Sequence, residues 1–67
     1  MTNEMIEAKV NEAVELSSVY GRAWLLSNGN ELMVTRREIE KDIFTDESRG
    51  YGFWVASIYE NGHLVEA

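Results

Sequence analysis

The sequence predicts a single α+β domain over residues 1–67, in the order αββαββ, with four strands in one antiparallel sheet. Two Asn-Gly dipeptides, Asn28-Gly29 and Asn61-Gly62, each separate two apolar runs, which is a strong short-range signal of a β-hairpin. A helical repeat of apolar residues precedes the first hairpin, and a helix-capping signal precedes the second. A chain of 67 residues has room for one domain, and a domain of this size is marginally stable.

The first helix is predicted from Thr2 to about Ser18. Thr2 or Asn3 can cap its N-terminus, and Gly21 ends it. The buried side follows the helical period through Ile6, Val10, Ala13, Val14 and Ser17. The opposite side carries a row of glutamates at Glu4, Glu7, Glu12 and Glu15.

The first hairpin is predicted to pair residues 20–27 with residues 30–35. A two-residue type I′ turn at Asn28-Gly29 sets the register, because both central residues of that turn need a positive φ. Trp24 then pairs with Met33 on one face of the sheet. The other pairs expected in this register are Leu25–Leu32, Ala23–Val34, Leu26–Glu31 and Arg22–Thr35.

A capping box opens the predicted second helix, with Thr35 as the N-cap residue and Glu38 at position N3. Ile39, Ile43 and Phe44 form its expected buried side. Residues 45–50 are polar and charged, which predicts a loop.

The second hairpin is predicted to join residues 52–60 to residues 63–67 through Asn61-Gly62, with Ile58 opposite Val65 and Tyr59 opposite Leu64. Its first strand is apolar on both sides, which is typical of a central strand covered twice. The two expected faces are Trp54, Ala56 and Ile58 on one side and Phe53, Val55 and Tyr59 on the other.

Charge and composition indicate the class of protein. Twelve carboxylates against six bases give a net charge of −6 and a pI of about 4.5, so the chain repels phosphate and anionic lipid and attracts basic protein surfaces. The acidic N-terminus has no continuous apolar run, which argues against a signal peptide or a membrane span. The chain also has no Cys. These features predict a soluble cytoplasmic protein.

No arrangement of residues predicts catalysis. His63 is the only histidine and lies beside a turn, where pairing with a carboxylate is the ordinary explanation. The segment Gly50-Tyr51-Gly52 precedes a strand rather than a helix, so it does not form a phosphate loop. Asp42, Asp46 and Glu47 lack the alternation of a calcium-binding loop. We therefore expect no enzyme, no cofactor and no metal site.

Two features could carry binding to a protein. The glutamates Glu4, Glu7, Glu12 and Glu15 could steer a basic partner, although such a face also serves solubility alone. The two hairpins also hold more apolar side chains than two short helices can cover, and Trp24, Met33, Phe53 and Tyr59 are the predicted anchors. The competing interpretation is that these four residues are core. Val55, Tyr51 and Leu64 belong to the same surplus.

The basic residues near the sheet aromatics suggest a different partner, single-stranded nucleic acid, through Arg36, Arg37, Lys41 and Arg49. The overall negative charge and the lack of an RNA-recognition strand motif argue against it.

The sequence thus predicts an acidic interaction module, a non-catalytic inhibitor or modulator of a larger protein with a basic, nucleic-acid-handling surface. Small inhibitors of host defence encoded by phages and plasmids share this size and charge, which is an analogy of class alone. The alternative is a homodimer with a structural or regulatory role, since association would relieve the marginal stability.

Overall fold

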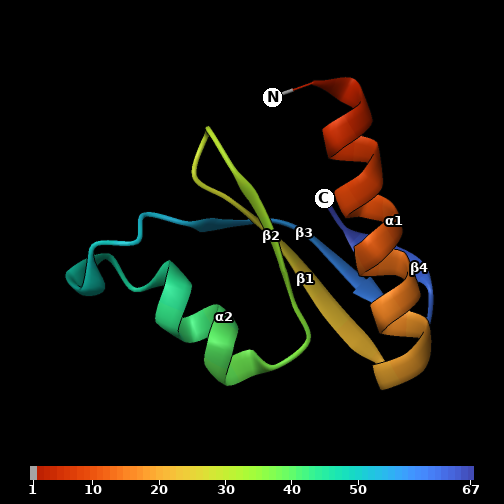
Figure 1. Ribbon diagram of the computed structural model, residues 1–67. Helices are drawn as coiled ribbons and strands as arrows, with labels where there is room; N and C mark the ends of the chain where they lie inside the picture. The colour runs from red at the N-terminus through yellow and green to blue at the C-terminus, as the bar shows by residue number, and fades with distance from the viewer. Residues whose placement is uncertain (1) are drawn as a thin grey trace.

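The computed structural model describes residues 2–67 and confirms the predicted α+β fold with αββαββ order (Figure 1). The strands form one antiparallel sheet in the order β2-β1-β3-β4, so the two hairpins join through β1 and β3. The elements in chain order are α1 (Asn3–Tyr20), β1 (Arg22–Ser27), β2 (Leu32–Thr35), α2 (Glu38–Thr45), a 3₁₀ helix (Glu47–Arg49), β3 (Trp54–Glu60) and β4 (His63–Glu66).

The helix α1 begins one residue after the predicted start at Thr2 and ends two residues later than Ser18. Thr2 is its N-cap residue, and the Thr2 side chain accepts a hydrogen bond from the N–H of Met5 at 3.2 Å. Gly21 follows the last turn with a φ of +95°, a conformation that glycine adopts without steric cost.

Across residues 2–67, no helix is both long enough and apolar enough to pass through a bilayer.

The first hairpin has the predicted faces but a different register. Leu25 lies opposite Val34, a shift of two residues from the type I′ register. The cause is Asn28, whose Oδ1 accepts hydrogen bonds from the N–H groups of Asn30 at 2.9 Å and Glu31 at 2.7 Å, so that a four-residue loop replaces the two-residue turn. Because the shift is even, no side chain changes face. The observed pairs are Trp24–Thr35, Leu25–Val34, Leu26–Met33 and Ser27–Leu32.

The second hairpin contains the predicted two-residue turn. Asn61 has a φ of +50° and Gly62 a φ of +84°, as a type I′ turn requires. Tyr59 lies opposite Leu64, which confirms this part of the register.

Irregularities in β3 change two other predictions. Ile58 lies opposite Glu66 rather than Val65, because the ladder with β4 shifts between Ile58 and Tyr59. A second shift occurs in the ladder with β1. Phe53 and Tyr59 were expected on one face, but this second shift places Phe53 on the α2 side and Tyr59 on the α1 side.

The predicted capping box at α2 is absent. Arg37, not Thr35, is the N-cap residue, and it makes no side-chain capping bond. Thr35 instead belongs to β2, where it lies opposite Trp24, and its buried hydroxyl has no hydrogen-bond partner among residues 2–67. Strand pairing at the end of β2 therefore prevails over the local cap. The predicted loop at residues 45–50 contains the 3₁₀ helix.

The two helices lie on opposite faces of the sheet (Figure 1). The buried cluster under α1 consists of Ala13, Ala23, Leu25 and Tyr59, with Val10, Val14, Leu16, Leu32 and Val34 packed around it. The cluster on the α2 side consists of Trp24, Leu26 and Phe53, with Met33, Phe44 and Ile58 around it. The core is thus split into two layers by the sheet.

Candidate functional site

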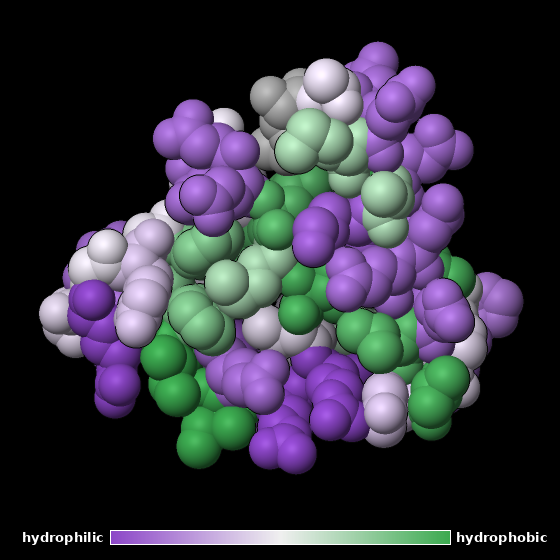
Figure 2. Space-filling view, viewed as in Figure 1, coloured by the Kyte–Doolittle hydropathy of each residue, from purple (hydrophilic) through white to green (hydrophobic). Residues whose placement is uncertain are grey.

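The predicted glutamate row forms the outer face of α1. The residues Glu4, Glu7, Glu12 and Glu15 are all exposed, and this set is called the acidic face below. Within residues 2–67, Lys9 makes the one ion pair to the acidic face, at 3.4 Å from Glu12. In Figure 2 hydrophilic atoms dominate the surface of α1, and hydrophobic atoms gather between α1 and α2. The acidic face therefore meets solvent directly.

The opposite side of α1 holds this face in place. Ala13 and Ser17 are fully buried against the sheet. The Oγ of Ser17 accepts a hydrogen bond from the N–H of Gly62 at 2.9 Å, which joins α1 to the turn between β3 and β4. The glutamates are thus displayed from a helix whose rotation is fixed.

The predicted apolar anchors are found mainly in the core. Trp24 is 7% exposed, Phe53 9% and Tyr59 4%, and Met33 is half-buried. The expectation that Trp24, Phe53 and Tyr59 form an exposed patch is therefore wrong in this conformation. The reason is that α1 and α2 each cover one face of the two central strands. The role of these residues in partner binding stays a prediction.

Surplus apolar surface does exist, at other positions. Val55, Tyr51 and Leu64 are exposed, and the sequence predicts all three as part of the surplus apolar surface. Trp54, at 53% exposure, was missed, because the irregular pairing of β3 carries no sequence signal. The large apolar side chains exposed on the described chain are Met5, Ile6, Val19, Tyr20, Ile39, Tyr51, Trp54, Val55, Leu64 and Val65.

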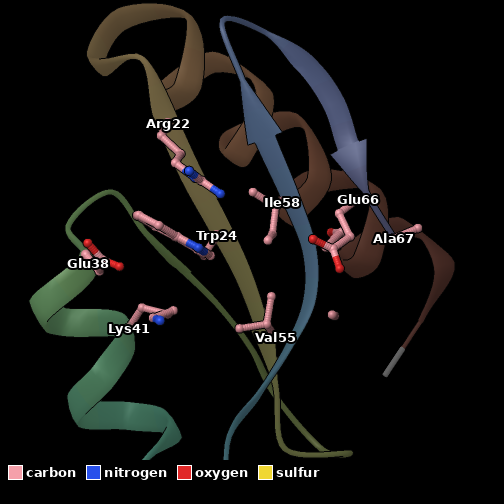
Figure 3. A pocket seen from close by; sticks show the side chains of 10 residues that line it. Arg22, Trp24, Glu38, Lys41, Val55, Ile58, Glu66 and Ala67 are labelled. Carbon is pink, nitrogen blue, oxygen red and sulfur yellow. The ribbon is translucent and has the colours of Figure 1, made fainter.

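A cleft of about 370 Å³ opens on the α2 side of the sheet (Figure 3). Trp24, Val55 and Ile58 line it from β1 and β3. Two cations flank the Trp24 indole, since the Arg22 guanidinium carbon lies 5.2 Å and the Lys41 Nζ 6.0 Å from the ring centre. The other lining residues are Glu38, Ala56, Ser57, Glu66 and Ala67.

The four basic residues that suggested nucleic acid do not form one stacking platform. The Arg36 guanidinium lies 4.1 Å from the ring centre of Tyr20, at the end of α1. Lys41 pairs with Asp42 at 2.7 Å, and Arg49 pairs with Asp46 at 3.5 Å. The Trp24 ring beside Lys41 is buried, so stacking of bases on it would require the sheet to be uncovered.

The acidic residues after α2 have a local structural role. Asp46 accepts hydrogen bonds from the Ser48 hydroxyl at 2.7 Å and the Ser48 N–H at 3.0 Å, which caps the 3₁₀ helix. These two bonds, together with the charge of Arg49, hold the pKa of the Asp46 carboxyl below its usual value.

His63, the single histidine, is exposed at the start of β4 and lies opposite Glu60. The Glu60 carboxylate pairs with Arg22 at 3.3 Å. Across the described residues 2–67, no three His, Asp or Glu side chains are grouped so as to hold a metal ion.

Comparison with known proteins finds no matching family model, no matching curated protein and no matching solved structure.

Proposed function

We propose that this protein is a non-catalytic interaction module that docks through its acidic face on a basic surface of a larger protein and thereby inhibits or modulates it. The observation that supports the proposal is the row of four exposed glutamates on one side of a helix whose other side is fixed to the sheet. A pre-ordered charged surface of this kind accelerates association with an oppositely charged partner by about 10–10³-fold at low salt.

The partner class follows from the charge. A basic surface on a protein is commonly a surface that holds the phosphates of nucleic acid. An acidic helix on that surface would compete with nucleic acid for the same Lys and Arg side chains, which is a direct route to inhibition.

The experiment is capture of binding proteins from the source organism's lysate, with and without nuclease, followed by association kinetics with the purified partner. The test variant replaces Glu4, Glu7, Glu12 and Glu15 with Gln, which changes the net charge from −6 to −2 by removing four negative charges. The control variant replaces Glu31, Glu40, Glu47 and Glu60 with Gln, which gives the same net charge and leaves both α1 and the side chains that line the cleft unchanged.

We expect a nuclease-resistant partner whose association rate falls about tenfold or more for the α1 variant and less for the control. The salt dependence of the rate should flatten in the α1 variant only. Equal rates for the α1 variant and the wild type would remove the acidic face from the mechanism. Loss of all captured protein on nuclease treatment would contradict a protein partner.

A further inference from the structure

The two helices cover the two faces of the sheet to different extents. α1 packs against all four strands, whereas α2 packs mainly against β2 and β3. The part of the α2-side face that lies toward β4 is therefore open, and the cleft described above occupies it (Figure 3). The floor of this cleft includes Val55, which is 37% exposed, beside the half-buried Ile58.

The charges around the cleft differ from those of the rest of the molecule. Two bases, Arg22 and Lys41, and two acids, Glu38 and Glu66, line it, so that its side chains are formally balanced. Of the six bases and twelve acids in the chain, four bases and ten acids then remain elsewhere. Two copies of a protein with net charge −6 repel each other over most orientations, and the side chains of the cleft add no net charge to that repulsion.

The charges also lie on opposite banks. Lys41 projects from α2 on one side of the cleft, and Glu66 lies on β4 at the other side (Figure 3). A two-fold axis that runs along the cleft exchanges the two banks, so each Lys41 would face Glu66 of the partner subunit. Lys41 already pairs with Asp42 at 2.7 Å, but an ammonium group has three donors and can serve a second carboxylate.

From this self-complementarity we infer that the cleft is the interface of a homodimer, in which a second copy covers the open face of β3. Apolar contact at Val55 and Ile58 supplies the central area, and the pairs between Lys41 and Glu66 of the partner subunit fix the register. The interface is separate from the acidic face, so a dimer would display two such faces. Covering this surface also stabilises a domain of 67 residues, which buries little apolar area alone.

Sedimentation equilibrium of the purified chain tests the inference. The weight-average mass should rise with protein concentration from the 7.7 kDa of one chain towards twice that value. Glu66→Lys should raise the dimer dissociation constant about tenfold, because each dimer contains the pair twice and one exposed ion pair is weak. Lys41→Glu should act in the same direction, and the double variant should restore dimerisation.

The controls carry the same charge changes away from the cleft. Lys9→Glu and Glu31→Lys both alter exposed or half-exposed positions outside the cleft. In these two variants the dimer dissociation constant should change only as far as the change in net charge alters the repulsion between two copies. Circular dichroism verifies that each variant is folded, and Glu66, which is exposed, decides the test if Lys41→Glu unfolds the chain. A monomer mass at concentrations up to about 1 mM would overturn the inference, as would a dimer that Glu66→Lys leaves unchanged.

Discussion

A hydrogen bond between the Ser17 hydroxyl and the Gly62 backbone joins the first helix of the chain to its last turn. The Oγ of Ser17 donates to the carbonyl of Val14 at 2.9 Å and accepts from the N–H of Gly62 at 2.9 Å. A buried helix residue thereby satisfies a turn N–H that is 45 positions away in the sequence. The helix that carries the acidic face is tied to the second hairpin by this one contact as well as by packing.

Replacing Ser17 with Ala should destabilise the fold by about 1–2 kcal/mol, because the Gly62 N–H loses its acceptor in a partly buried place. Such a loss lowers Tm by about 5–10 °C in a domain of this size, which thermal denaturation followed by circular dichroism can measure. Ser18→Ala is the matched control, since the Ser18 hydroxyl makes the same type of bond to Val14 but is exposed. An equal Tm for the two variants would contradict the role of Ser17.

Replacing Gly62 with Ala should cost about 2 kcal/mol or more in the free energy of unfolding. Its φ is +84°, and an added Cβ would lie 2.5 Å from the Oγ of Ser18. Gly50→Ala is the control for backbone strain alone, because Gly50 has a φ of +79° with no neighbour within 4 Å of its Cβ position. Urea denaturation should show a larger loss for Gly62→Ala, and Ser18→Gly in that background should recover part of it.

The side chains of the first hairpin show why the fold could be predicted. The period-2 alternation assigned Ala23, Leu25 and Val34 to one face, and this survives any even shift of register. The register depended on the conformation of the loop that begins at Asn28. An Asn-Gly sequence is compatible with a two-residue type I′ turn and also with the observed four-residue loop, which the Asn28 side chain closes. The alternation of apolar and polar residues therefore determined which side chains share a face of the sheet. The hydrogen bonds of the Asn28 side chain determined which residues of β1 and β2 lie opposite each other.

The candidate site was predicted only in part, for a different reason. The acidic face followed from helical period, because four solvent-facing positions need no tertiary information. The burial of Trp24, Phe53 and Tyr59 depends on where the second helix lies and on the bulged pairing of β3, and neither has a local sequence signal. Lys41 on α2 and Glu66 on β4 likewise line the same cleft only because of the order of the strands in the sheet.

Replacing Asn28 with Ala should destabilise the first hairpin by about 1–2 kcal/mol. The Oδ1 of Asn28 accepts two hydrogen bonds that close the loop, and alanine offers no acceptor. Asn28→Asp should retain most of the stability, because a carboxylate oxygen can accept the same bonds. Chemical denaturation of both variants tests this, with Asn30→Ala as a control that keeps the Asn28 acceptor. Equal stability of Asn28→Ala and Asn28→Asp would show that the loop is closed by backbone contacts alone.

Acidification should release the 3₁₀ helix after α2. Hydrogen bonds from Ser48, aided by Arg49, hold the pKa of Asp46 below its usual 3.8, so the folded state binds this proton more weakly than the unfolded state does. The stabilising contribution is therefore complete above about pH 3.8 and is lost as the pH falls through the lower folded-state pKa. An NMR titration should show the Asp46 carboxyl and the Ser48 amide changing together below that pH. Asp46→Asn should abolish the change at Ser48, and a midpoint above 3.8 would contradict the assigned hydrogen bonds.

The neighbouring aromatics Phe53 and Trp54 should respond very differently to truncation. Phe53 is 9% exposed and packs edge-on against Phe44 with ring centres 6.1 Å apart, so Phe53→Ala should cost about 3 kcal/mol or more and unfold much of a marginal domain. Trp54 is 53% exposed, so Trp54→Ala should cost about 1 kcal/mol or less. Differential scanning calorimetry of the two variants measures both effects. A stable folded Phe53→Ala would mean that Phe53 is free to serve as the surface anchor that the sequence suggested.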